Sequence, residues 1–144
     1  MTLASGAATY PIDVGTLDEV RRFALTLPRT TEGFVGARVK FYIGRIVYLA
    51  FSRDETVMGF AFPKEERDWL VGGTPEKFML PSAPDLRYHW VLVRMTAIGE
   101  PEMRELVMDA WRMVVPKRVV AAYDAAVVAG NQLVDPRGFE PLTS

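Results

Sequence analysis

The sequence predicts an α+β fold of two layers, in which a largely antiparallel sheet carries flanking helices. Three observations support this. Apolar residues recur at helical spacing near both ends of the chain, within residues 16–27 and 100–128. Between these ends, short segments alternate polar and apolar residues, which is typical of strands with one buried face. The first of these segments are joined by short turns, and strands connected in this way run antiparallel.

The first predicted helix covers residues 16–27. Thr16 and Glu19 form a capping box, in which each side chain can hydrogen-bond an exposed amide at the start of the helix. Pro28 ends the helix because proline cannot continue the ladder of backbone hydrogen bonds. The apolar face that this helix presents comprises Leu17, Val20, Phe23, Ala24 and Leu27.

Three strands of a meander are predicted over residues 38–43, 46–51 and 56–62. Gly44 and Arg45 separate the first two strands, and a two-residue connection with glycine first suits a type II′ turn. The alternation places the polar side chains of the first strand on one face of the sheet. Helices are expected to cover the other face, so the polar face stays partly open.

The middle of the chain is predicted to contain a helix, a loop and a further strand. A short helix is predicted over residues 64–71, where a pair of glycines ends it. Residues 74–85 contain three prolines and are expected to form a loop, with one helical turn near residues 76–78. A fourth strand is predicted over residues 90–96.

Two further helices are predicted from residue 100 onward. In the first, the apolar positions follow helical spacing without a miss, and Trp111 stands in the middle of the stripe. We therefore expect Trp111 to be buried between this helix and the sheet. Met108 and Met113 lie off the stripe, and they either widen the buried face or meet a partner. Pro116 begins the last helix, which is expected to reach about residue 128.

Composition excludes several classes of protein. None of the 144 residues is cysteine, which excludes disulfides, zinc–thiolate sites, iron–sulfur clusters and cysteine nucleophiles. Hydrophobic residues make up 49% and charged residues 24%, the values of a globular domain. No apolar run reaches the roughly 18 residues of a membrane span, and the N-terminus lacks the pattern of a signal peptide. We expect a cytoplasmic protein that does not contact membranes.

No common catalytic motif occurs in the sequence. The phosphate-binding loop ending in Gly-Lys-Ser/Thr, the Gly-x-Ser-x-Gly elbow and the His-Glu-x-x-His zinc motif are all missing. His89 is the only histidine, and it is interpreted as a structural residue that hydrogen-bonds backbone or closes a loop. Trp69 and Trp90 are interpreted as core or interface residues rather than base-stacking platforms. No catalytic residue, metal ion or cofactor is expected.

Basic residues gather in two places, although the formal net charge is -1. The segment from Arg29 to Arg53 holds five basic residues and one acid, and a second cluster surrounds the junction of the last two helices. Such patches can attract a phosphate backbone. The alternative is a solvated surface that keeps an exposed sheet face soluble. The candidate nucleic-acid-binding residues are Arg38, Lys40, Arg45, Arg53, Arg112, Lys117 and Arg118.

Four local patterns occur in a specific order along the chain. They are Leu27-Pro28 ahead of Thr31-Glu32-Gly33, the hairpin over residues 39–51, His89-Trp90-Val91-Leu92-Val93, and Val115-Pro116-Lys117-Arg118. With them the chain resembles the MmcQ/YjbR-like family over roughly residues 17–123. The resemblance implies a two-layer α+β fold, related in shape to secretion-chaperone-like domains. It also implies DNA binding, a label that derives from a proposed double-wing arrangement of the family's hairpins. No catalytic residue is established for the family, so none is carried over.

The domain organisation follows from these patterns. A single domain is predicted over residues 16–129, preceded by an extension over residues 1–15 and followed by a tail over residues 130–144. The tail contains Gly138-Phe139-Glu140-Pro141, which is what the T-arm of a bacterial tRNA gene encodes when read as protein. We interpret the tail as translated tRNA-gene sequence in a bacterial protein. The alternative is an ordinary polar C-terminus.

Two functions of different kinds are compatible with these observations. The first is a non-enzymatic nucleic-acid-binding domain, with weak, electrostatic and sequence-tolerant binding. The alternative is a protein-interaction or dimerisation module of chaperone-like shape, which would bind a protein partner or a second copy of the chain. An enzyme that acts on a small molecule has the least support, and a deep pocket with convergent polar groups would favour it.

Overall fold

The computed structural model of the protein describes residues 15–134. The chain forms two compact units, which divide between Val114 and Val115. The first contains the sheet and three of the helices, and the second contains α5 (Lys117–Val134). Residues 1–14 and 135–144 lie outside the described residues, and with them lies most of the predicted extension and tail. The single domain predicted over residues 16–129 stays a prediction.

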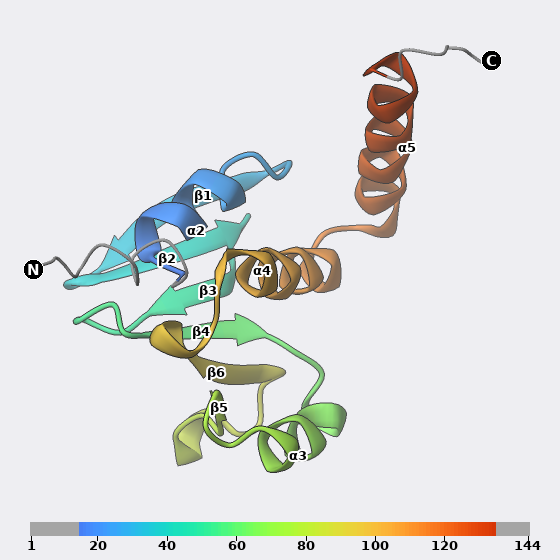
Figure 1. Ribbon diagram of the computed structural model, residues 1–144. Coiled ribbons are helices and arrows are strands. Elements are labelled where there is room, and N and C mark those ends of the chain that lie inside the picture. The colour runs from blue at the N-terminus through green and yellow to red at the C-terminus, as the bar shows by residue number, and fades with distance from the viewer. Residues whose placement is uncertain (1–14, 135–144) are drawn as a thin grey trace, which may run out of the picture. The chain divides into compact units, whose positions relative to one another are not determined.

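A six-stranded antiparallel sheet is the centre of the first unit, and its strands follow the order β1-β2-β3-β4-β6-β5 from top to bottom of Figure 1. The predicted α+β class and largely antiparallel sheet are therefore confirmed. The predicted meander forms β2, β3 and β4, while the predicted strand over residues 90–96 is β6 and ends at Arg94. The strands are β1 (Thr30–Val35), β2 (Arg38–Ile43), β3 (Ile46–Phe51), β4 (Val57–Ala61), β5 (Phe78–Met79) and β6 (Trp90–Arg94).

Both strands at the sheet edges escaped prediction. None of the six residues of β1 is buried, so this strand carries no strong apolar alternation to reveal it. β5 has two residues and directly follows the helical turn that was expected near residues 76–78, where the Lys77 and Phe78 amides both donate hydrogen bonds to the Thr74 carbonyl. The turn between β1 and β2 begins with Gly36 at φ +64°, and the turn between β2 and β3 begins with Gly44 at φ +61°. In the turn at Gly44, the first central residue has a positive φ and the second, Arg45, does not, which fits the predicted type II′ turn.

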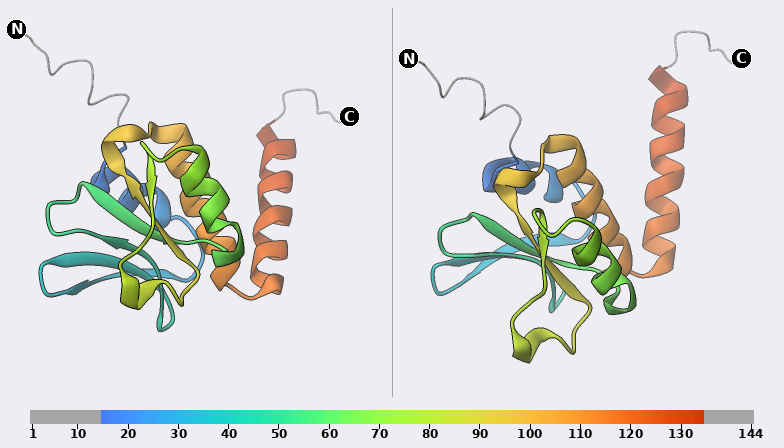
Figure 2. Two further views of the ribbon diagram at one scale, coloured as in Figure 1. Left: turned by 90° about the horizontal axis from the view of Figure 1, so that it is seen from below. Right: turned by 60° about the horizontal axis from the view of Figure 1, so that its bottom comes forward.

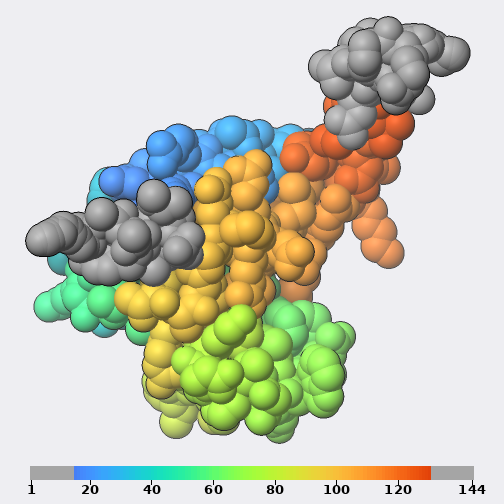
Figure 3. All heavy atoms as spheres, in the orientation of Figure 1, coloured from blue at the N-terminus to red at the C-terminus, as the bar shows by residue number. Residues whose placement is uncertain are grey.

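Helices α2 (Leu17–Ala24) and α4 (Glu100–Val114) cover one face of the sheet, as two further views confirm (Figure 2). In the space-filling view, atoms of α2 and α4 cover much of this face (Figure 3). Thr16 caps α2 as predicted, because its hydroxyl accepts a hydrogen bond from the Glu19 amide. The reciprocal half of the predicted capping box does not form, because the buried Oε1 of Glu19 has no hydrogen-bond partner among the described residues. The Arg21 guanidinium ties α2 to β1, with its Nε 2.9 and 3.0 Å from the two carboxylate oxygens of Glu32. This pairing raises the pKa of Arg21.

The core lies between these helices and the sheet. Trp111 of α4 has no exposed surface, as predicted from its place in the apolar stripe. A β-bulge opposite Phe41 and Tyr42 leaves Tyr48 without a partner in β2, and both Tyr48 and its neighbour Leu49 are fully buried. The other large, fully buried side chains are Phe41, Phe51, Phe60, Met58, Met103, Val20, Val91, Val93 and Val107.

Helix α3 (Lys64–Gly73) lies beside β5 and β6, at the lower edge of the sheet in Figure 1. It continues through both glycines that were expected to end it. Its Arg67 is the buried residue, whereas Trp69 is 82% exposed. A core position for Trp69 was therefore a wrong prediction, because α3 turns a side chain two residues from Arg67 away from the packed face. An interface role for Trp69 stays a prediction.

Around β6 and in the last helix, the bounds and types of the elements differ from those that the sequence predicts. The 3₁₀ helix η1 (Ala83–Asp85) lies in the loop between β5 and β6, and η2 (Met95–Ala97) follows β6 directly. Helix α5 extends beyond residue 128 to Val134. Within residues 15–134, no helix combines the length and the apolar character needed to span a bilayer.

Candidate functional site

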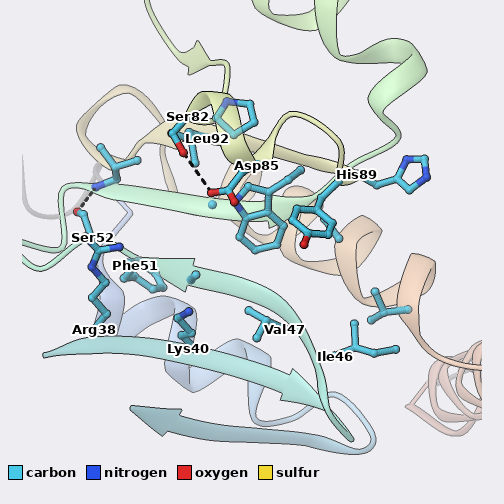
Figure 4. A pocket seen from close by; sticks show the side chains of 18 of the residues that line it. Arg38, Lys40, Ile46, Val47, Phe51, Ser52, Ser82, Asp85, His89 and Leu92 are labelled. Atoms are coloured by element: carbon cyan, nitrogen blue, oxygen red, sulfur yellow. Dashed lines mark hydrogen bonds between the residues drawn. The ribbon is translucent and has the colours of Figure 1, made fainter. Parts of the chain in front are cut away.

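The face of the sheet opposite α2 and α4 contains a hollow of about 900 Å³. We call it the sheet groove. Strands β2, β3, β4 and β6 provide its floor and one rim, and the loop between β5 and β6 provides the other rim (Figure 4). The residues that matter for its chemistry are Arg38, Lys40, Arg45, Asp85, His89 and Trp90.

Small side chains form the middle of the groove floor. Ala50 of β3 pairs with Gly59 of β4, and Gly59 in turn pairs with Leu92 of β6. Cross-strand partners point to the same face of a sheet, so all three face the groove. Ala61, two residues after Gly59, belongs to the same face and also lines the groove. The hollow exists because these positions fill little volume above the sheet.

Trp90 lies directly against Gly59. A Cβ atom at position 59 would stand 2.6 Å from Nε1 and 2.7 Å from Cε2 and Cζ2 of the Trp90 indole. No side chain larger than hydrogen fits there unless the indole moves. Trp90 is partly buried and lines the groove, so its ring is a flat apolar surface within it. Glycine inside a strand marks such close approaches, and Gly59 between two apolar residues was the available sequence signal.

The rim at β2 is basic. Arg38 and Lys40 alternate with the buried Val39 and Phe41, so strand periodicity turns both cations toward the groove. Figure 4 shows the two side chains on the same side of the groove, above β2. Arg45 follows Gly44 in the turn after β2 and lines the same hollow. Among residues 15–134, neither Arg38, Lys40 nor Arg45 has an ion-pair partner.

The opposite rim is formed by residues of the β5–β6 loop, including Pro81, Ser82 and Asp85. Ser82 donates a hydrogen bond of 3.3 Å to the Asp85 carboxylate (Figure 4). The same loop also carries Arg87, whose guanidinium lies 4.8 Å from the ring centre of the groove residue Tyr88 and donates a hydrogen bond of 2.7 Å to its hydroxyl. The groove is therefore electrostatically asymmetric, with three cations on the β2 side and one carboxylate together with one cation across from them.

Arg67 of α3 holds this loop in place. Its Nη1 donates to the carbonyl oxygens of Tyr88 and Trp90, and its Nη2 donates to that of Leu86, at 2.8 to 3.1 Å. The planar guanidinium suits this task because its donors point in fixed directions. Arg67 carries no group into the groove, but it fixes the backbone that presents Tyr88 and Trp90.

His89 joins the same loop to the start of α3. Its Nδ1 accepts a hydrogen bond of 3.0 Å from the Lys64 amide, and its carbonyl accepts one of 3.1 Å from the Phe62 amide. The interpretation of His89 as a structural residue is thereby confirmed, although its ring also borders the groove. No group of three or more His, Cys, Asp or Glu side chains within the described chain is arranged to hold a metal ion.

Comparison with known proteins places the chain in a family. The YjbR family model matches residues 25–113, which is more than half of the 144 residues. The chain belongs to the YjbR family. Its fold is similar to the crystal structure of Deinococcus radiodurans protein DR2400, whose family-model domain is DUF419. That match has a TM-score of 0.60 and 19% sequence identity, and it covers 72% of this chain and 80% of the other. The curated proteins contain no match.

The structure of this YjbR-family protein brings together three of the seven predicted site residues, namely Arg38, Lys40 and Arg45. Arg53 is exposed in the turn after β3 and does not line the groove. Arg112 lies on α4, on the helical side of the sheet, and does not line the groove either. Lys117 and Arg118 belong to α5 in the second unit.

Sequence reasoning missed three features of the groove in this YjbR-family protein. Trp90 was expected in the core or an interface; it lies outside the core, on the open face of the sheet against Gly59, and an interface role stays a prediction. Asp85 was counted among loop residues, with no role assigned. Met113, which was expected to widen a buried face or to meet a partner, is 41% exposed and borders the groove.

Proposed function

We propose that this YjbR-family protein is a non-enzymatic nucleic-acid-binding domain, in which Arg38, Lys40 and Arg45 contact the phosphate backbone. The observation that supports this most directly is the position of the three cations along one rim of a concave surface. Their charges are not neutralised by any ion pair among the described residues, so phosphates can approach without breaking an existing contact.

The proposed binding is local and electrostatic. The whole chain has a formal net charge of -1, so attraction must come from this rim and not from the overall charge. Three phosphate contacts are few, and non-specific binding of this kind has Kd values of about 10⁻⁶ M or weaker at physiological salt. The rim offers no helix that could enter a major groove, so we expect little preference among base sequences.

A salt-titrated binding assay tests the proposal. Fluorescence anisotropy of a labelled oligonucleotide would be measured for the full chain and for the Arg38→Ala/Lys40→Ala double variant. We expect the double variant to bind all sequences more weakly and to show a smaller dependence on salt. Arg53→Ala is the control, because it removes an exposed cation of the same hairpin region outside the groove. Undetectable binding of the unchanged protein at low salt would refute the proposal.

A protein-interaction or dimerisation module remains the second candidate, and the exposure of Trp69 favours it. A tryptophan that is 82% exposed is unusual on a monomeric surface, and tryptophan is enriched where partners bind. Sedimentation of the unchanged protein and of Trp69→Ser would test this. A dimer that dissociates in the variant, together with undetectable nucleic-acid binding, would favour this second function.

A further inference from the structure

We infer that the sheet groove takes single-stranded nucleic acid, with an unpaired base stacked on the indole of Trp90 while adjoining phosphates lie at Arg38 and Lys40. This inference rests on the proposed function, which leaves open whether the strand is paired. The inference specifies that the bound nucleic acid is unpaired and that Trp90 recognises its exposed base.

The first support is the way Trp90 is held. Its indole lies against Gly59, where a Cβ atom would be only 2.6 to 2.7 Å from three of its ring atoms. The backbone of Trp90 is fixed in turn, because β6 pairs with β4 and the Trp90 carbonyl accepts a hydrogen bond from Arg67. An indole on a fixed backbone has only two side-chain torsions left to restrict, so it loses little freedom when a base stacks on it.

A second aromatic ring on the same face is arranged in the same way. Tyr42 of β2 lies across Gly33 of β1, where a Cβ atom would stand 3.1 Å from Cε1 of the tyrosine ring. Tyr42 pairs with Val47, a residue of the groove, so it belongs to the open face. Three strand spacings separate β2 from β6, which amounts to about 14 Å across the sheet. Open sheets with two or three aromatic side chains on one face are a recurrent platform for unpaired bases.

The charge distribution orients the strand. Phosphates are attracted to Arg38 and Lys40 at the β2 rim, whereas the opposite loop holds one carboxylate, Asp85, and one cation, Arg87, and so offers no net attraction. The part of a nucleotide that faces away from β2 must therefore be the uncharged base, and the surface it meets is apolar: Trp90 and Leu92. Cations on one side and an aromatic ring on the other match the two halves of a single nucleotide.

Double-stranded nucleic acid matches this arrangement less well. In a duplex, each base is already stacked between its neighbours and paired, so its flat face is not available to Trp90. A duplex can present phosphates to Arg38 and Lys40, but its bases make no stacking contact with Trp90. Binding to a duplex should therefore depend on the cations and be independent of Trp90.

The decisive experiment compares one labelled strand with its own duplex at the same salt concentration, by fluorescence anisotropy with the full chain. We expect Trp90→Ala to raise the Kd for the single strand about ten-fold, the loss typical of one stacked base, and to leave the Kd for the duplex unchanged. Trp90→Phe keeps an aromatic ring and should lose much less. Trp69→Ala is the matched control, because it removes an exposed tryptophan outside the groove.

Gly59→Ala tests the same contact without removing the indole. The added methyl group must displace the indole from its position against residue 59. We therefore expect weaker binding of the single strand and unchanged binding of the duplex. Circular dichroism would verify that each variant is folded. Should Trp90→Ala fail to fold, Trp90→Phe and Gly59→Ala still separate the two strand states.

A spectroscopic readout is also available. In a Trp69→Phe background the remaining tryptophans are Trp90 and the fully buried Trp111. Stacking of a base on Trp90 should quench its fluorescence on addition of the single strand but not of the duplex.

The outcomes separate this inference from the proposed function. If Arg38→Ala/Lys40→Ala weakens binding while Trp90→Ala and Gly59→Ala leave it unchanged, the proposed function stands and the stacking inference is overturned. Equal affinity for strand and duplex, without fluorescence quenching, also overturns it. If the unchanged protein binds neither form at low salt, both the inference and the proposed function fail.

Discussion

The indole nitrogen of Trp111 donates a hydrogen bond of 2.9 Å to the carbonyl oxygen of Pro28, 83 residues earlier in the chain. Trp111 belongs to α4, and Pro28 lies in the turn between α2 and β1. The bond therefore joins the helix in the middle of the covered sheet face to the segment that leads from the first helix into the edge strand. It also gives the polar atom of a fully buried ring the partner that it requires.

We predict that Trp111→Ala lowers the free energy of unfolding by about 3–5 kcal/mol, because it leaves a large cavity in the core. Trp111→Phe keeps a ring but leaves the Pro28 carbonyl without this donor, and it should cost less than Trp111→Ala. Urea denaturation measures both changes. An unchanged unfolding midpoint for Trp111→Ala would contradict the placement of this residue in the core.

Tyr48 should titrate late. Burial of its phenol raises its pKa to about 12, although the hydrogen bond of 2.7 Å with the Thr30 hydroxyl opposes this shift. A raised pKa in the folded state means that the stabilising contribution is complete below pH 10 and is lost as the pH rises from about 10 toward 12. An absorbance titration of phenolate should show one of the five tyrosines ionising last, and Tyr48→Phe should remove that step. Loss of a different step would assign the late titration to another tyrosine.

Arg67 should matter for stability and for the far rim of the groove. Arg67→Met removes the donors to the carbonyls of Leu86, Tyr88 and Trp90, and we expect a loss of about 3 kcal/mol. Arg67→Lys should recover part of it at most, because an ammonium group lacks the planar fork of donors. Denaturation and hydrogen exchange of the amides in residues 81–89 measure the two effects. Arg22→Met on the exposed side of α2 is the control, and equal losses in both variants would contradict a specific role for Arg67.

The dependence of nucleic-acid binding on salt should reflect the number of groove cations. With three phosphate contacts, log affinity should fall with log salt at a slope of about −2 for a single strand and about −3 for a duplex. Arg38→Ala/Lys40→Ala should bring either slope close to that of a single contact. The slopes come from anisotropy titrations at several salt concentrations. Arg53→Ala is measured in the same way. If it reduces the slope as much as the double variant does, the contact surface extends beyond the groove.

Local sequence patterns predicted much of the fold because they report local physics. The Thr16 cap, the apolar stripe around Trp111 and the glycine at position 44 each act within a few residues, and each appears in the structure as expected. The edge strand β1 was missed because an edge strand that buries little has little reason to alternate polar and apolar residues. The position of Trp69 was missed because an apolar side chain in a short helix does not by itself show which side of the helix is packed.

What the sequence determined by itself is the class of fold, the order of most elements and the basic, polar face of β2 that carries Arg38 and Lys40. Only the tertiary structure decided that Trp90 joins those cations on one concave surface. Twenty-eight residues separate Ala61 from Trp90, yet the two are paired in neighbouring strands. The intervening chain forms α3 and β5, and β6 then pairs with β4. Strand order and register arise from contacts between segments distant in sequence, and a register change of one residue would turn Trp90 to the other face. No local pattern contains that information.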